Sequence, residues 1–416
     1  MHMLKKITVN QLQLGMHLKE FCGSWMDHPF WRTGFVLTDP TDLDLILKST
    51  IKEVWIDVSL GDDVPEGQAA MCEEALIPAE QVQKLELPVV PHLLRDTTPV
   101  SAAQEIERAA RICQESKAAV VSMFEEVRMG NAVDVGGARQ LVEDISDSVS
   151  RNPGALISLA RLKTADQYTY MHSVAVCAMM VALAKMLGLD EAQTRLCGMA
   201  GLLHDLGKVA MPIEVLNKPG KLSDTEFTII RTHPAEGFRM LKFNADINPA
   251  VIDVVLHHHE RIDGNGYPDR LRGDQISLYA KMSAVCDVYD AITSNRPYKV
   301  GWDPAESLRR MAEWAKGHFD PTVFQAFVKS MGIYPVGSLV RLNTGRIGVV
   351  TEQSAGSLTT PIVKVFFSTK SNMRITPYML NLSLPGSAEK IFQREDPDKW
   401  KFPDLNEMWS GLSSPG

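Results

Sequence analysis

The residues of this chain that could do chemistry are concentrated in its middle third. Six of its eleven histidines fall between residues 172 and 259, and three of them are consecutive. These six are His172, His204, His233, His257, His258 and His259. Imidazoles are the usual ligands of transition metals at neutral pH, and packing alone rarely requires so many. Carboxylates are interleaved at Asp205, Asp287 and Asp290. The pattern predicts a metal site built from several helices.

The same residues indicate how many metals the site would hold. His204 and Asp205 are adjacent, so on a helix their side chains diverge by about 100° and can serve neighbouring ions. Lys208 is three residues after Asp205, so on a helix the two side chains lie on the same face. Five imidazoles and two carboxylates exceed the needs of one metal, but they suit two octahedral ions with positions left for water and phosphate. Ligation without thiolates favours iron or manganese over structural zinc. Two such ions suit in-line hydrolysis of a phosphate ester.

Length and composition limit the class of protein. A chain of 416 residues predicts two or three domains, and 45% apolar with 23% charged residues is typical of a soluble globular protein. The net charge of -8 argues against binding a nucleic acid polymer. No signal-peptide pattern or long apolar run is present, so we expect a cytoplasmic protein without a membrane span. Its six cysteines form no CxxC pair, which indicates free thiols.

The chain divides into four predicted parts. Apolar residues alternate within residues 1–66, which predicts a small strand-rich domain. Residues 67–150 are predicted to form a linker and helical connector, with Ala103, Ile106, Ala110 and Ile112 as its apolar stripe. Residues 151–335 are helical. Residues 336–416 are predicted to form a small β extension and a tail. The fold class is mainly α.

Capping signals locate the helices that must position the site. A helix over 168–187 ends at Gly188. Asp190 with Gln193 forms a capping box that begins a helix running towards Gly207, and Ser223 with Glu226 forms another before a helix that reaches His233. Further helices are predicted over 249–259 and 277–294.

The order of these motifs resembles the HD-GYP family, a branch of the HD-domain metal-dependent phosphohydrolases. The resemblance covers about residues 152–335 and includes Asp-Gly-x-Gly-Tyr-Pro at 263–268. It implies an all-helical HD-type bundle that hydrolyses cyclic di-GMP to pGpG, with GMP as an alternative end product, through a metal-bridging hydroxide. The strand-rich start is similar to the small domain of unknown function that precedes HD-GYP in many bacterial proteins.

The resemblance also implies roles for single residues. The metal ligands are matched by His172, His204, Asp205, His233, His258, His259 and Asp287. Asp205, as the bridge between the ions, and Lys208, which meets the phosphate, are the expected catalytic residues. The substrate contacts are matched by Lys208, Gly266, Tyr267, Pro268, Asp290, Arg296 and Lys299. Tyr168 stands where some members place a third-metal glutamate, so two divalent ions, iron or manganese, are implied. His257 is expected to support the site without ligating.

Two alternatives stay open beside the cyclic di-GMP phosphodiesterase. One is a hydrolase of cyclic GMP-AMP or another nucleotide phosphate ester, because the same metal ligands would serve either substrate. The other is a non-catalytic adaptor that senses a cyclic dinucleotide, although the intact ligand set speaks against it. A homodimer and a signalling partner bound through the N-terminal domain are equally open.

Overall fold

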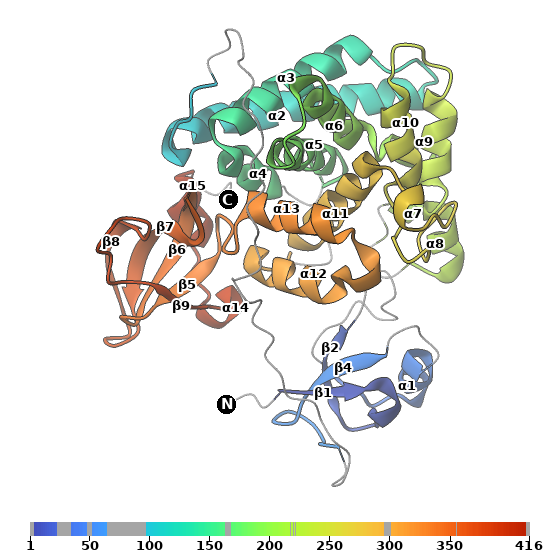
Figure 1. Cartoon of the computed structure of the whole chain (residues 1–416). Coiled ribbons are helices and arrows are strands. Elements are labelled where there is room, and N and C mark those ends of the chain that lie inside the picture. Colours follow the sequence, from blue (N-terminus) through green and yellow to red (C-terminus); the bar gives the residue numbers. More distant parts are fainter. Residues whose placement is uncertain are drawn as a thin grey trace. The chain divides into compact units, whose positions relative to one another are not determined.

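The computed structural model describes two compact units, residues 1–91 and 92–416 (Figure 1). Within them it describes residues 4–22, 35–47, 52–64, 97–162, 168–216, 218, 220, 222–294, 301–354 and 356–412.

The first unit is a small antiparallel sheet with one helix. Its strands are β1 (Leu4–Thr8), β2 (His17–Cys22), β3 (Phe35–Val36) and β4 (Glu53–Asp57), in the order β1-β4-β2-β3, and its helix is α1 (Pro40–Leu47). Alternation along the strands buries Ile7, Leu18, Val54 and Ile56 in one core. The prediction of a strand-rich N-terminal part is confirmed.

The second unit is mainly a helical bundle, as predicted. Its helices are α2 (Ala102–Arg128), α3 (Val135–Arg151), α4 (Pro153–Arg161), α5 (Tyr168–Met186), α6 (Glu191–Leu203), the short 3-10 helix η4 (Leu206–Ala210), α7 (Ile213–Leu216), α8 (Asp224–Ile230), α9 (His233–Leu241), α10 (Pro249–His257), α11 (Leu278–Thr293), α12 (Pro304–His318) and α13 (Pro321–Met331). No helix among these residues combines the length and apolarity needed to cross a bilayer.

Helix α5 is the centre of the bundle. Every residue from Met171 to Ala184 is buried, because α4, α6 and α11 all pack against it (Figure 1). The helix ends as the sequence predicted, with Gly188 in the left-handed region at φ 73°. A polar side chain on such a helix has no access to bulk water, so His172 must find its partners inside the protein.

Three sequence-based boundaries or faces differ from the structure. Helix α6 ends at Leu203, so His204 and Asp205 lie at the junction with η4. His233 begins α9 and does not end α8, because Pro234 lacks an N–H and is tolerated only in a first turn. The predicted stripe on α2 is only partly right, since Ile106 packs against a hydrophobic core and the other predicted members do not reach full burial. Ala103 is exposed and the buried face carries Glu105, whose carboxylate accepts two 2.8 Å hydrogen bonds from Arg151.

The C-terminal part is a five-stranded antiparallel sheet of order β8-β7-β6-β5-β9. Its strands are β5 (Leu339–Leu342), β6 (Arg346–Ser354), β7 (Ser357–Ser368), β8 (Met373–Asn381) and β9 (Ile391–Arg394), followed by α14 (Pro397–Trp400) and α15 (Leu405–Ser410). Trp409 of α15 is buried with Leu339 and Phe366, and Leu159 of α4 packs against the same cluster. The tail therefore docks, and the sheet shares an apolar core with the helical bundle.

Candidate metal centre

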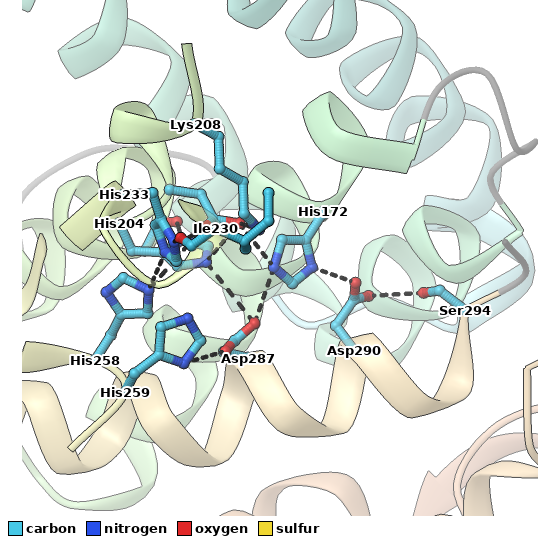
Figure 2. Close-up of polar contacts among 12 residues, drawn as sticks. His172, His204, Lys208, Ile230, His233, His258, His259, Asp287, Asp290 and Ser294 are labelled. Atoms are coloured by element: carbon cyan, nitrogen blue, oxygen red, sulfur yellow. Dashed lines mark hydrogen bonds and ion pairs between the residues drawn. The ribbon is translucent and has the colours of Figure 1, made fainter. Parts of the chain in front are cut away.

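The seven predicted ligands converge from separate segments of the bundle. Figure 2 labels six of them, all except Asp205. They form two groups, in each of which one ligand atom per residue lies within 4.8 Å of the others. One group is Asp205, His233, His258 and His259, and the other is His172, His204 and Asp287. The chain reaches this arrangement because four other helix ends or faces meet beside α5, which carries His172.

Asp205 faces both groups with different oxygens. Its Oδ1 lies 3.2 Å from Nε2 of His233 and 3.8 Å from Nε2 of His258. Its Oδ2 lies 3.4 Å from Nε2 of His172 and 3.4 Å from Nε2 of His204. This is the placement that a carboxylate needs to bridge two cations.

Asp287 on α11 also spans the two groups. Its Oδ1 lies 3.0 Å from Nε2 of His172, and its Oδ2 lies 3.6 Å from Nδ1 of His259. The sequence indicated Asp287 as a ligand but gave no reason to expect that it would reach both groups. Asp287 can contact both groups because α11 packs against α5, which carries His172.

Backbone carbonyls orient three of the imidazoles. Nδ1 of His204 donates to the carbonyl of Gly201 at 2.8 Å, and Nδ1 of His233 donates to that of Ile230 at 2.7 Å. Nδ1 of His258 donates to that of Val255 at 3.1 Å. With Nδ1 protonated, each Nε2 is left as a lone-pair donor directed into the cluster, which is the tautomer that a metal requires.

Asp290 holds the fourth imidazole. Its Oδ2 lies 2.6 Å from Nδ1 of His172, and its Oδ1 accepts a hydrogen bond from Ser294 at 3.1 Å (Figure 2). Only 2% of Asp290 is exposed. The sequence resemblance predicted that Asp290 would contact the dinucleotide. In the structure its carboxylate contacts His172 and Ser294 and orients the His172 ring, while the contact with the dinucleotide stays a prediction.

The residues fit divalent cations. Nε2 of His204 and Oδ1 of Asp205 are buried without a hydrogen bond to any described residue, which costs about 1–3 kcal/mol per group when nothing else binds there. Burial and the neighbouring imidazoles hold the pKa of His258 well below its usual range. Burial also lowers the pKa of His259 to about 3. Both rings are therefore neutral and able to ligate.

The acidic ligand Asp205 is charged. Burial favours the protonated acid, but Lys208 and His204 outweigh it and hold the pKa of Asp205 well below its usual value. The Lys208 ammonium donates a hydrogen bond to Oδ2 of Asp205. The side chain of Lys208 is 20% exposed and that of His259 is 12% exposed, whereas those of the other histidine ligands are at most 2% exposed. The centre is open on the side of Lys208 and His259.

Glu260 organises the loop after the histidine triplet, a role that sequence reasoning missed. Its buried carboxylate accepts hydrogen bonds from the backbone N–H of Asp269 at 2.7 Å and of Leu271 at 3.1 Å. A Cβ on Gly266 would lie 2.5 Å from the backbone of both Glu260 and Arg261, so only glycine fits there. The sequence did contain a signal for this role, namely an acidic residue directly after the histidine triplet. Its meaning became clear only from the folded loop, whose N–H groups it binds.

The remaining predicted residues take different positions. The Tyr267 ring stacks on His259 with centroids 4.7 Å apart, and Pro268 follows it at the partly buried edge of the loop. His257 points away from the ligands, with Nδ1 2.7 Å from Asp253 and Nε2 3.0 Å from Asp269, as expected of a supporting residue. Arg296, Lys299 and the side chain of Tyr168 lie outside the described part of the chain, so their roles stay predictions.

Comparisons with known proteins find two family domains in this chain. Residues 145–323 match the HD domain family, and residues 4–138 match a domain of unknown function, DUF3391. A cyclic di-GMP phosphodiesterase of Pseudomonas aeruginosa is 55% identical over 412 residues, which are 99% of this chain and 97% of that protein. The solved HDG"Y"P protein Bd1817 of Bdellovibrio bacteriovorus is 17% identical, with a TM-score of 0.45 over 79% of this chain and 99% of its own.

Shorter matches come from other bacteria. The cyclic di-GMP phosphodiesterase response regulator RpfG of Xanthomonas campestris is 42% identical over 35% of this chain and 39% of its own length. The 3'3'-cGAMP-specific phosphodiesterase 1 of Vibrio cholerae is 36% identical over 40% of this chain and 39% of its own length.

A helical bundle with His and Asp residues grouped as candidate ligands, an HD-domain match and a full-length relative define the class as an HD-domain protein. The chain belongs to the HD-GYP family, with an N-terminal domain of the DUF3391 type.

Proposed function

We propose that this chain is a metal-dependent phosphodiesterase that hydrolyses cyclic di-GMP to linear pGpG. The observation that carries the proposal is the position of Asp205, whose two oxygens face two separate groups of ligands while Lys208 stands beside them on the open side. The substrate is assigned from the full-length relative in P. aeruginosa, which is named for cyclic di-GMP.

Two divalent cations, iron or manganese, are the proposed cofactors. Asp205, His233, His258 and His259 would hold one, and His172, His204 and Asp287 the other, with both carboxylates placed to share. An imidazole and carboxylate set without thiolates suits these metals. When bound, such a pair supplies a nucleophilic hydroxide at neutral pH and charge stabilisation for a phosphoryl group.

The chain's own residues have distinct tasks in this reaction. Lys208 is the partly exposed cation nearest to Asp205, so it can donate a hydrogen bond to a phosphoryl oxygen whose negative charge increases in the transition state. Tyr267, stacked on His259, forms one wall beside that phosphate. Asp290 keeps His172 oriented.

The test is hydrolysis of cyclic di-GMP by protein purified without oxygen, with the metal content measured on the same sample. Appearance of pGpG by chromatography supports the proposal. Time courses then show whether GMP follows, and parallel assays with cyclic GMP-AMP rank the two substrates. Tight binding of cyclic di-GMP without turnover in metal-replete protein would favour the sensing adaptor instead.

A further inference from the structure

Arg231 is a cation beside the metal centre to which the motif pattern assigns no role. It follows α8 and stands two residues before the ligand His233. Its guanidinium carbon lies 4.4 Å from the centroid of the Tyr267 ring. The same ring stacks on His259, so a single aromatic side chain joins Arg231 to a metal ligand.

The Arg231 guanidinium is held in place by aromatic rings and is not paired with an acidic side chain of the described residues. The structure gives it contacts with the rings of Tyr267 and Phe227, and no hydrogen bond or ion pair from its guanidinium to any described residue. Arg231 is partly exposed, and its backbone N–H donates to Phe227, which fixes the turn that carries it. A guanidinium stacked on an aromatic ring keeps its five donors available at its edge.

Arg231 is joined through one ring to the most accessible of the candidate histidine ligands. Among the histidine ligands His259 has the most exposed side chain, and Tyr267 joins Arg231 to that residue. A substrate that approaches His259 therefore meets the Tyr267 ring, and Arg231 lies against that ring.

The chemistry of a cyclic dinucleotide supplies a partner for this cation. Its macrocycle contains two phosphodiesters, each with one negative charge. When one of them occupies the ions and Lys208, the other must remain nearby because the ring joins them. The fork of an arginine matches a phosphate with two parallel hydrogen bonds.

We infer that Arg231 binds the phosphodiester that is not being cleaved, with the Tyr267 ring presenting its guanidinium. This inference rests on the proposed function, since it requires a substrate with two phosphodiesters. Arg231 would thereby distinguish cyclic dinucleotides from esters that carry one phosphate.

The experiment compares Arg231→Gln and Arg231→Lys with wild type on three substrates: cyclic di-GMP, cyclic GMP-AMP and bis(4-nitrophenyl) phosphate, which has a single phosphodiester. For Arg231→Gln, we expect kcat/KM for cyclic di-GMP, relative to that for the single diester, to fall about 10- to 100-fold. The fall should lie mainly in KM and be equal for cyclic GMP-AMP. Arg231→Lys should recover part of it.

Arg239→Gln is the matched control, because Arg239 is exposed and paired with Glu236. It should leave all three rates unchanged, and thermal unfolding should show that each variant folds. An unchanged ratio in Arg231→Gln, or equal losses on the one-phosphate and two-phosphate substrates, would overturn the inference. Unequal losses on the two cyclic dinucleotides would also overturn it, since they would show that Arg231 recognises a base.

The design separates this inference from the proposed function. If wild type cleaves the single diester but neither cyclic dinucleotide, the proposed function fails. Equilibrium binding of cyclic di-GMP to wild type and Arg231→Gln then tests Arg231 directly, with weaker binding by the variant expected and equal binding contrary to the inference.

Discussion

Nδ1 of His172 lies 2.6 Å from Oδ2 of Asp290, although the two residues are 118 positions apart in the chain. The contact leaves Nε2 of His172 directed at Asp287, 3.0 Å away. Burial would lower the pKa of His172, but the hydrogen bonds with Asp287 and Asp290 outweigh it and raise that pKa. A carboxylate that accepts from the far nitrogen of a ligand imidazole fixes its tautomer and makes it a stronger donor.

Asp290→Asn should therefore weaken metal binding while preserving the fold. The amide keeps the shape of the side chain but is a poorer acceptor from His172, and we expect about a 10- to 100-fold loss in affinity for the ion held by His172, His204 and Asp287. Metal titration followed by elemental analysis measures this loss. Asp246→Asn, at an exposed position, is the control and should bind metal as wild type does. Equal metal affinity in both variants would refute the orienting role.

Asp205→Ala should remove activity more completely than the loss of any single histidine ligand, because it takes a ligand from both groups at once. We expect turnover of cyclic di-GMP to fall by about 1000-fold or more, with a metal content below one ion per chain. The helical circular dichroism should be retained. Wild-type turnover by this variant would exclude the bridging arrangement.

Lys208→Met should slow the chemical step and leave the metals in place. The ammonium is not among the candidate ligands, and its proposed task is to stabilise charge on the phosphoryl oxygen. Removing one such donor typically lowers kcat by about 100- to 1000-fold. Kinetics at matched metal content measure the effect, and Lys242→Met, at an exposed position, should have none. A change confined to metal content would assign Lys208 to the stability of the site.

His318 should make the protein sensitive to acid. Burial, together with Arg261, lowers the pKa of His318 to about 3, against an unfolded value of about 6.5. Between those two pKa values His318 is protonated in the unfolded chain and neutral in the folded chain. The free energy of unfolding therefore falls as the pH drops from 6.5 towards 3. From pH 7 to 5 this one residue accounts for about 2 kcal/mol of that fall.

His318→Phe tests this account, because the ring stacks on Phe319 with centroids 4.2 Å apart and its Nδ1 has no hydrogen-bond partner among the described residues. Chemical denaturation at pH 7 and pH 5 measures the change in the free energy of unfolding. The variant should lose about 2 kcal/mol less than wild type on acidification. An identical loss in both proteins would show that His318 is protonated in the folded state.

Much of this protein could be predicted from local sequence. The capping boxes at Asp190 and Ser223 mark real helix starts, and Gly188 ends α5 as predicted. Such signals work because a cap or a positive φ is satisfied by residues a few positions away. The stripe on α2 was predicted only in part, because the buried face also carries Glu105, and a charged residue is recognised as buried only when its partner Arg151 is seen.

The sequence by itself determined which residues could ligate a metal and the order in which they occur, because the capacity to ligate depends on the type of side chain. Only the tertiary structure decided how they are used. It turned Asp290 towards His172, let Asp287 reach both groups, and placed Arg231 on Tyr267. These contacts join distant segments, and their geometry depends on how α5, α10 and α11 pack, which no local pattern records.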